Sequence, residues 1–289
     1  MLRPRVLILT GYDAAFAPIA ALTVPRMQAY AARHGYDFRF TQTDEHRGRK
    51  PNWIKITLIR KALAEDPHDL VVWIDADAVI VRLDAELHEL LPSDADLGMV
   101  WHGGDGPDGK LNRDPAHFNN GVIIIRNGEW ARDHFRRVDE NPLLRHGLQE
   151  QATMMQQLGF DRNIGIGPDR PDAPDRAHVA RLDPAWNAIP RTATVADPII
   201  QHWAGLREER ADAIAADVSL LPLRDACGDQ ARLEIARLMS SWYDQASRID
   251  QIERRLERIL RSPRRLLQSM PAALRARWRA QWSRLCARF

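Results

Sequence analysis

The sequence predicts an α/β fold: a mixed, mostly parallel sheet between helices, followed by a C-terminal helical extension. Short apolar runs alternate with amphipathic segments over the first 200 residues, as in proteins whose parallel strands are joined by helices. After about residue 208 only helical periodicity remains. We therefore expect two parts, residues 1–208 and 209–289, in a chain long enough for one large core and an appendage.

Strands are expected at short apolar or alternating runs, and helices where apolar residues recur with a period near 3.6. The predicted strands cover residues 6–10, 37–41, 71–77, 97–101, 121–125, 179–182 and 199–202. The predicted helices cover residues 23–34, 53–64, 129–138 and 148–158. Thr23 is placed to cap the first of these helices and Gly35 to end it.

Cysteine content and hydropathy restrict the class of protein. Cys227 and Cys286 cannot form the disulfide framework of a small secreted protein. The apolar run at residues 6–9 is too short for an export signal, and no segment approaches the roughly 20 apolar residues of a membrane span. We therefore expect a cytoplasmic protein.

The formal net charge of +2 hides an asymmetry along the chain. Residues 261–289 contain eight Arg and no acidic residue, so the first 260 residues carry a charge of −6. A basic nucleic-acid-binding body is therefore not expected. Beyond Pro271, Leu and Trp share one helical face and Arg occupies the rest, which is typical of a peripheral helix at the inner face of a membrane. A helix docked on the protein, or a frayed end, is the alternative.

The helical extension also contains a heptad pattern. Trp242, Ile249 and Leu256 recur every seven residues. A helix packed on the first part of the chain explains this spacing, and a coiled-coil homodimer is the alternative.

Two acidic residues end the most apolar predicted strand. Asp75 and Asp77 stand two residues apart, so on an extended strand both carboxylates point to one face and can reach one hard cation such as Mg²⁺ or Mn²⁺. Surface acidic pairs are common, but a second apolar strand ends in His202, and ligands of such sheets bind at the carboxyl ends of strands. These three residues are the candidate metal ligands.

Four motifs occur in one order: Trp-Ile-Asp-Ala-Asp at 73–77, Phe-Asn-Asn-Gly at 118–121, Glu-Gln at 150–151, and His-Trp-Ala-Gly at 202–205. Over residues 5–206 the chain resembles metal-dependent glycosyltransferases of the GT-A fold. It is most similar to the retaining alpha-galactosyl/xylosyltransferases of family 34, which include fungal mannan and plant xyloglucan enzymes, with glycogenin-like family 8 enzymes as relatives.

The resemblance implies roles for the acidic pair and the histidine. Asp75 would contact the ribose and the metal, whereas Asp77 and His202 would ligate the metal directly. An imidazole beside two carboxylates favours Mn²⁺ over an all-oxygen Ca²⁺ site, with Mg²⁺ as the alternative. The cation would neutralise the charge that develops on the diphosphate leaving group of a nucleotide sugar.

The resemblance also implies a donor-binding set. Thr10, Gly11 and Tyr12 would hold the nucleoside, with Gly allowing close backbone approach and Tyr12 stacking on the base, although a plain turn also explains them. Lys55 lies in a Trp-x-Lys that would meet a phosphate, and a solvated helix Lys is the alternative. Asn119 would bind the donor as well.

Three further residues would act near the anomeric carbon. The side-chain amide of Asn120 would bond to sugar hydroxyls, although turn propensity also explains Asn-Asn-Gly. Glu150 or Gln151 would stabilise an oxocarbenium-like transition state, and we do not choose a nucleophile between them; helix capping is their structural alternative. The Gly-rich segment 102–110 is either a lid or acceptor contact, or a solvated connector.

We therefore expect a glycosyltransferase that moves a hexosyl or pentosyl unit from a nucleotide sugar, UDP-linked, to a glycan or lipid-linked acceptor, with retention implied by the resemblance. One alternative is a haloacid-dehalogenase-like phosphohydrolase with Asp75 as nucleophile, because Asp-Ala-Asp-Ala-Val fits its motif. That family carries the motif on its first strand, whereas here the strand is the third. The other alternative is a non-catalytic scaffold for oligomerisation or membrane docking.

Overall fold

The computed structural model describes residues 3–44, 48–65, 67–102, 117–189, 195, 197–206 and 209–226, together with the single residues 233 and 241. The chain divides into two compact units, Met1–Ser240 and Ser241–Phe289, and every helix and strand described below belongs to the first unit. The predicted heptads, basic helix and Gly-rich segment from 103 onward lie outside the described residues. The predicted division at residue 208 stays a prediction.

A six-stranded sheet forms the centre of the unit, in the order β2-β1-β3-β6-β5-β7. Its strands are β1 (Val6–Tyr12), β2 (Asp37–Gln42), β3 (Leu70–Ile74), β5 (Leu97–His102), β6 (His117–Arg126) and β7 (Val179–Leu182). β6 runs antiparallel to both of its neighbours, and the other pairs are parallel. The predicted mixed, mostly parallel sheet is therefore confirmed. A small second sheet pairs β4 (Ala78–Ile80) with β8 (Ile200–His202) in antiparallel fashion.

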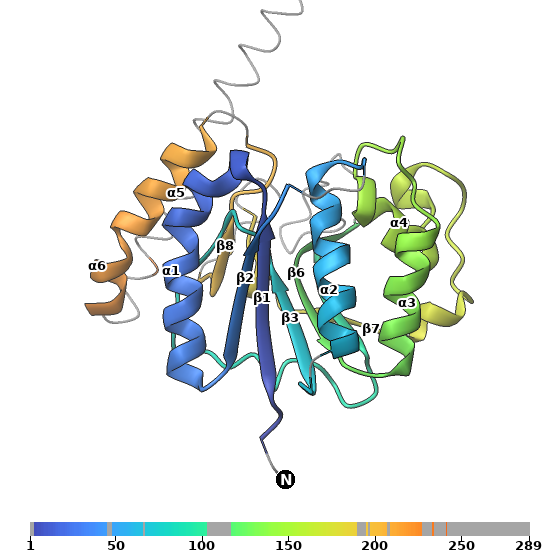
Figure 1. Ribbon diagram of the computed structural model, residues 1–289, viewed down its shortest axis with the longest axis horizontal. Coiled ribbons are helices and arrows are strands. Elements are labelled where there is room, and N and C mark those ends of the chain that lie inside the picture. The colour runs from blue at the N-terminus through green and yellow to red at the C-terminus, as the bar shows by residue number, and fades with distance from the viewer. Residues whose placement is uncertain are drawn as a thin grey trace, which may run out of the picture. The chain divides into compact units, whose positions relative to one another are not determined.

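Helices cover both faces of the large sheet (Figure 1). They are α1 (Ala17–His34), α2 (Ile54–Glu65), α3 (Glu129–Glu140), α4 (Gln149–Gln157), α5 (Arg210–Ser219) and α6 (Leu221–Ala226). Short 3₁₀ turns η1 (Ala14–Phe16), η2 (Pro51–Trp53), η3 (Arg162–Ile164), η4 (Pro174–His178) and η5 (Pro184–Asn187) join these elements. Figure 1 shows α1, with α5 and α6 outside it, on one side of the sheet, and α2, α3 and α4 on the other.

Each side of the sheet has its own apolar core. Leu7 and Leu9 of β1 pack with α2 and α3, whereas Val6 and Ile8 of the same strand belong to the cluster that includes α1. This division follows from the pleat, since successive side chains of a strand point to opposite faces. Strands covered on both faces must be apolar at every position, which is why they appear as continuous apolar runs in the sequence.

The first helix begins earlier than predicted, so the prediction that Thr23 caps it is wrong. α1 starts at Ala17 with Pro18 in its first turn, where the missing N–H has no helical partner to lose. Thr23 lies inside the helix, fully buried, and its Oγ1 donates to the carbonyl of Ala76 at 2.7 Å. The predicted end is confirmed: Gly35 has a left-handed φ of 65°.

Two strands extend further than the apolar pattern indicated. β1 continues to Tyr12, so Gly11 and Tyr12 belong to the strand and do not follow it. Asn119, Asn120 and Gly121 lie within β6 and not before a strand, because β6 begins at residue 117. A register shift between Met99 and Val100 of β5 accompanies this longer pairing. Within the described ranges, no helix combines the length and hydrophobicity needed to cross a bilayer.

Candidate active site

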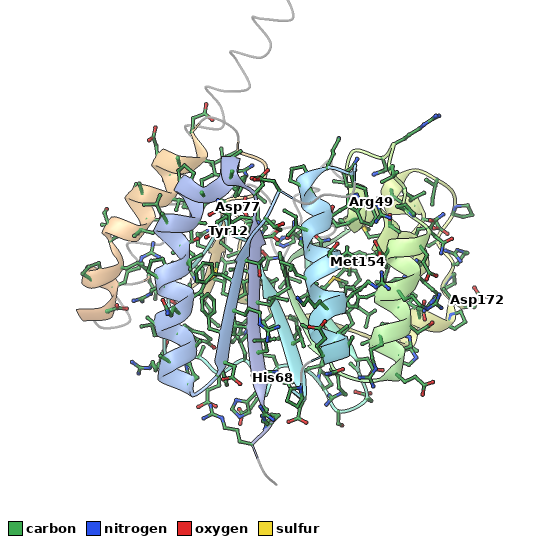
Figure 2. All side chains as sticks on the ribbon, viewed as in Figure 1. Tyr12, Arg49, His68, Asp77, Met154 and Asp172 are labelled. Atoms are coloured by element: carbon green, nitrogen blue, oxygen red, sulfur yellow. The ribbon has the colours of Figure 1, made fainter. Side chains whose placement is uncertain are left out.

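A pocket of about 420 Å³ opens at the carboxyl ends of β1 and β3. Figure 2 shows Tyr12 and Asp77 at this end of the sheet and His68 at the opposite end. The pocket is lined by most of the predicted site residues: Gly11, Tyr12, Lys55, Asp75, Asp77, Asn119, Asn120, Glu150, Gln151 and His202. Segments far apart in the sequence therefore meet at one place, as expected for ligand sites of α/β sheets.

Asp75, Asp77 and His202 form a group of potential metal ligands. One ligand atom from each lies within 4.8 Å of the others. His202 Nε2 is 3.2 Å from Asp77 Oδ1 and 3.9 Å from Asp75 Oδ2. β4 and β8 pair so that Ala78 stands opposite His202, and this pairing brings the imidazole next to Asp75 and Asp77. Two carboxylates and one imidazole are a donor set that suits Mn²⁺ or Mg²⁺.

Asp77 is the more buried of the two acids, and both of its oxygens have partners. Burial opposes its ionisation, but His202 and Arg210 outweigh burial and lower the pKa of Asp77 to about 2. Arg210 Nη1 lies 3.2 Å from Asp77 Oδ2, and its guanidinium stands over the ring of Phe16. Asp77 is thus an anion with the positive charge of the Arg210 guanidinium close to it.

No sequence pattern indicates that Arg210 or Asn187 belongs to this site. Arg210 is the first residue of α5, in the predicted helical extension, and no spacing from His202 marks it as a site residue. Asn187 ends η5, and its Oδ1 lies 2.8 Å from His202 Nδ1. An isolated Asn in a Trp-Asn pair carries no pattern that indicates this contact.

Gly121 makes room for the imidazole of His202. A Cβ at position 121 would lie 2.1 Å from His202 Cε1 and 2.5 Å from Nδ1. Only glycine allows the ring to sit against β6 at this point. The Asn-Asn-Gly motif therefore has a packing function besides any contact with a ligand.

Lys55 is buried, and its ammonium bonds to Asp75 and Asn120, which line the pocket. Its ammonium lies 3.0 Å from Asp75 Oδ1 and donates to the carbonyl and the Oδ1 of Asn120 at 2.8 and 3.0 Å. Trp73 Nε1 donates to the same Asp75 carboxylate at 2.6 Å. Lys55 therefore holds Asp75 and Asn120 in place, and a phosphate contact would add to these bonds.

Glu150 and Gln151 lie in the first turn of α4 beside Asn120. The Nδ2 of Asn120 donates to Glu150 Oε1 at 3.3 Å, and its backbone N–H donates to Gln151 Oε1 at 3.1 Å. Burial raises the pKa of Glu150, and the Lys55 ammonium 3.6 Å away opposes that shift. Glu150 Oε2 is buried with no hydrogen-bond partner in the described part of the chain. Such an atom is suited to a ligand that enters the pocket.

Thr10, Gly11 and Tyr12 differ in their relation to the pocket. Gly11 and Tyr12 line it, whereas Thr10 is completely buried and is not among the lining residues found in the described ranges. A Cβ on Gly11 would meet Leu58 Cδ1 at 2.3 Å, so a larger residue here would force the end of the Leu58 side chain on α2 to move. Tyr12 stacks on Phe40 of the edge strand β2, with the rings 2° from parallel.

The fold is that of GT-A glycosyltransferases. The chain superimposes with a TM-score of 0.55 on a glycosyltransferase involved in the glycosylation of the major capsid of PBCV-1. The match covers 74% of this chain and 100% of that chain at 18% identity, which establishes similarity of fold. The predicted fold class is confirmed.

Residues 4–100 match the profile of the galactosyl transferase GMA12/MNN10 family. An uncharacterized alpha-1,2-galactosyltransferase of Schizosaccharomyces pombe is 30% identical over 165 residues, 45% of this chain and 44% of that protein. An alpha-1,2-galactosyltransferase of the same yeast is 25% identical over 143 residues, 40% of this chain and 38% of that protein. The predicted resemblance to this family is confirmed, and the matches span less than half the length of these two relatives.

Proposed function

We propose that this protein is a metal-dependent glycosyltransferase that moves a sugar from a nucleotide donor to a glycan or lipid-linked acceptor. The observation that carries the proposal is the convergence of Asp75, Asp77 and His202 on one pocket of about 420 Å³. The GT-A fold and the similarity of residues 4–100 to a galactosyltransferase family support it.

The donor set fits a divalent cation. Asp77 and His202 would hold the cation, with Asp75 as a further ligand that also faces Lys55. Mn²⁺ is the expected ion and Mg²⁺ the alternative, because an imidazole joins the carboxylates. When bound, the cation would stabilise the negative charge that develops on the departing diphosphate.

The residues at the start of α4 would face the sugar. Asn120 positions both Glu150 and Gln151 through the bonds described above. A carboxyl or amide oxygen next to the anomeric carbon would stabilise positive charge as the donor bond breaks. Retention of the anomeric configuration rests on the family resemblance alone. The buried Glu150 Oε2 is the atom in this group without a hydrogen-bond partner among the described residues.

The first test is calorimetric titration of UDP, with GDP as the nucleotide control, in Mn²⁺ and then in EDTA. We expect UDP to bind in Mn²⁺ and the affinity to fall on the order of 100-fold in EDTA, because a cation held by Asp75, Asp77 and His202 would neutralise the charge of the diphosphate. Asp77→Asn keeps the size of the side chain, removes the charge and should cause a similar loss. Asp94→Asn is the matched control, since Asp94 is exposed and away from the pocket.

UDP binding that is equal in Mn²⁺ and EDTA, or unchanged in Asp77→Asn, would contradict the proposal. If neither nucleotide binds, the protein should be assayed with an aryl phosphate. Hydrolysis that disappears in Asp75→Asn would favour the phosphohydrolase alternative. Binding of no nucleotide together with no hydrolysis would favour the scaffold alternative.

UDP-galactose is the first donor to test, since both curated relatives are named as galactosyltransferases. The assay would follow UDP release with simple galactosides and mannosides as acceptors, and the anomeric configuration of the product would test retention. Other UDP-hexoses and UDP-pentoses serve as specificity controls. Equal turnover of all donors would contradict selection by the groups around Asn120.

The basic segment 261–289 supports a peripheral location at a membrane, where lipid-linked glycans are made. Cosedimentation with anionic vesicles that is lost in neutral vesicles or at high salt would support it. Binding that is the same to both vesicles would contradict it.

A homodimer formed through the heptads of the extension would appear as a concentration-dependent mass in light scattering.

A further inference from the structure

We propose that Asn187 is a positioning residue that fixes the proton of His202 on Nδ1 and so leaves Nε2 free to bind the divalent cation. The proposal rests on the proposed function, because it concerns a cation held by His202. It assigns a role to a residue that neither the sequence motifs nor the pocket lining indicates.

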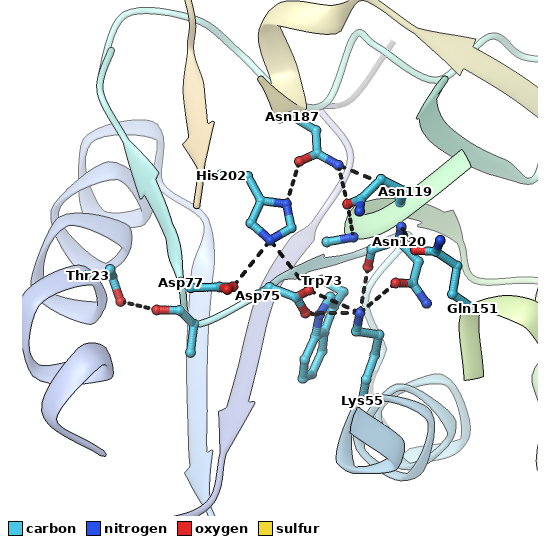
Figure 3. Close-up of polar contacts among 12 residues, drawn as sticks. Thr23, Lys55, Trp73, Asp75, Asp77, Asn119, Asn120, Gln151, Asn187 and His202 are labelled. Atoms are coloured by element: carbon cyan, nitrogen blue, oxygen red, sulfur yellow. Dashed lines mark hydrogen bonds and ion pairs between the residues drawn. The ribbon is translucent and has the colours of Figure 1, made fainter. Parts of the chain in front are cut away.

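Two side chains and one backbone amide form a chain of hydrogen bonds that ends at the imidazole of His202 (Figure 3). The N–H of Gly121 donates to Asn119 Oδ1 at 2.8 Å. Asn187 Nδ2 donates to the same Asn119 Oδ1 at 2.9 Å, and Asn187 Oδ1 lies 2.8 Å from His202 Nδ1. We call these groups the amide relay.

The direction of the amide relay is fixed at its backbone end. A backbone N–H can only donate, so the atom of Asn119 that faces Gly121 must be the carbonyl oxygen. That oxygen requires the NH₂ of Asn187 on its other side, which turns the Asn187 carbonyl toward His202. The orientation of the Asn187 amide, which is ordinarily ambiguous, therefore follows from a group that cannot be reversed.

An acceptor at Nδ1 determines which nitrogen can ligate a cation. A neutral imidazole carries one proton and one lone pair, so a proton held on Nδ1 leaves the lone pair on Nε2. Nε2 faces Asp77 and Asp75, at 3.2 and 3.9 Å. If the proton were on Nε2, it would bond to Asp77 and block the ligand position.

The surroundings prevent water from replacing Asn187. Asn187 is completely buried and His202 is 2% exposed. The backbone keeps the two residues in register, because Ala188, next to Asn187, accepts from the N–H of His202 at 2.8 Å and donates to Ile200 at 2.9 Å. Partners of metal-bound histidines act in this way in other sites, and their loss typically reduces metal affinity about 10- to 100-fold.

The first measurement is Mn²⁺ affinity by electron paramagnetic resonance. Asn187→Leu keeps the approximate size and removes the acceptor, so we expect an affinity about 10- to 100-fold below the wild type. Asn119 uses only its carbonyl oxygen in the amide relay, so Asn119→Asp should retain the relay and bind Mn²⁺ at least as tightly as the wild type. Asn119→Leu should weaken binding. Asn141→Leu, at an exposed residue away from the pocket, controls for the apolar substitution, and thermal unfolding checks that each variant is folded.

The second measurement is the ¹⁵N NMR spectrum of the His202 ring in EDTA, at a pH where the imidazole is neutral and with Asp77→Ala present in every sample. This background is needed because the Asp77 carboxylate, 3.2 Å from Nε2, would otherwise compete with Asn187 for the proton. In this background we expect the Nδ1–H tautomer with Asn187 unchanged and with Asn119→Asp, and the Nε2–H tautomer with Asn187→Leu. A merely structural role of Asn187 would not change the tautomer in a folded variant.

Asn187→Leu that retains the Nδ1–H tautomer overturns the proposal. A changed tautomer with Mn²⁺ affinity within twofold of the wild type overturns the positioning role as well. If the wild type binds no Mn²⁺, the proposed function fails, and the NMR comparison alone decides whether the amide relay fixes the proton of His202.

Discussion

Arg210 pairs with Asp77 on the carboxylate oxygen that His202 does not face: Nη1 is 3.2 Å from Oδ2, and His202 Nε2 is 3.2 Å from Oδ1. A cation that binds Asp77 must therefore compete with a positive charge that is already present. Because Arg210 also lines the pocket, its guanidinium would be available to the diphosphate of the proposed donor.

Arg210→Gln should change metal and nucleotide binding in opposite directions. Removing the competing charge should raise Mn²⁺ affinity in the absence of nucleotide roughly fivefold, corresponding to about 1 kcal/mol. The affinity for UDP in saturating Mn²⁺ should fall, because a charge-assisted donor is lost. Calorimetry of each ligand checks both directions. A fall in both affinities would show that Arg210 instead supports the geometry of Asp77.

Gly121→Ala should disrupt the metal site more than the fold. The added Cβ would lie 2.1 Å from His202 Cε1, so the imidazole must move away from the acidic pair. We expect Mn²⁺ affinity to fall at least about tenfold, with a loss of stability of about 1–3 kcal/mol from overpacking. Gly128→Ala is the matched control, because a Cβ there meets no atom within 4 Å. Normal Mn²⁺ binding by Gly121→Ala would contradict the packing role.

Glu150→Gln should lower activity without lowering stability. The folded protein raises the pKa of Glu150 above its ordinary value of 4.5, chiefly by burial. The protonated carboxyl group makes its full contribution to the free energy of unfolding below pH 4.5. This contribution is lost as the pH rises through the pKa of the folded state, because an ionised carboxylate is then buried. The neutral amide avoids this cost, so the variant should become more stable relative to the wild type as the pH rises from 5 to 8.

Thermal unfolding at pH 5 and pH 8, together with a sugar-transfer assay, would test the Glu150 prediction. Glu89→Gln serves as control, because the Glu89 side chain is 78% exposed. A stability difference between Glu150→Gln and the wild type that does not change with pH would argue against a raised pKa. Undiminished transfer would exclude the carboxyl group from the reaction.

Asp175→Asn should destabilise the protein in a pH-dependent manner. Burial works against ionisation of Asp175, but His134, Arg137 and Trp130 hold its pKa well below the ordinary 3.8. Arg137 Nη1 lies 2.7 Å from one carboxylate oxygen, and Trp130 Nε1 donates to the other at 2.9 Å. A depressed pKa stabilises the fold above about pH 4, and this contribution is lost as the pH falls toward the folded pKa.

We expect Asp175→Asn to cost about 1–3 kcal/mol at pH 7 and clearly less at pH 3, as measured by urea unfolding. Asp133→Asn should cost less than about 1 kcal/mol at pH 7, because the Asp133 side chain is 46% exposed and its bonds to Arg136 and Arg137 are accessible to water. An equal cost of Asp175→Asn at both pH values would contradict the assigned pKa direction.

The sequence predicted the parts of the site that come from local pattern. β3 reads as a continuous apolar run because both faces of the sheet are covered, and this run correctly places Asp75 and Asp77 near the end of a strand. The predicted strand over 71–77 is too long, however: β3 ends at Ile74, so the two acids lie in the turn before β4 and not on an extended strand. His202 was identified in the same way, as the last residue of an apolar strand. The ends of strands are marked by composition, so residues that follow them can be placed from sequence.

Contacts that depend on tertiary packing could not be predicted. The antiparallel direction of β6 places Asn119 and Asn120 beside α4, yet an apolar run does not reveal the direction of a strand. Thr23 has a residue type that commonly caps a helix, but here its hydroxyl bonds to a carbonyl 53 positions away in the chain. Asn187 is likewise a site residue only because η5 and β8 are adjacent in space.

The space that Gly121 leaves for the ring of His202 links two positions that are 81 residues apart in the chain. A side chain at the first position excludes the imidazole of the second from its place beside the acidic pair. In homologous sequences, the two positions should therefore covary: replacement of the glycine should accompany loss of the histidine. Homologues that retain the histidine ligand should therefore keep glycine at the position of Gly121.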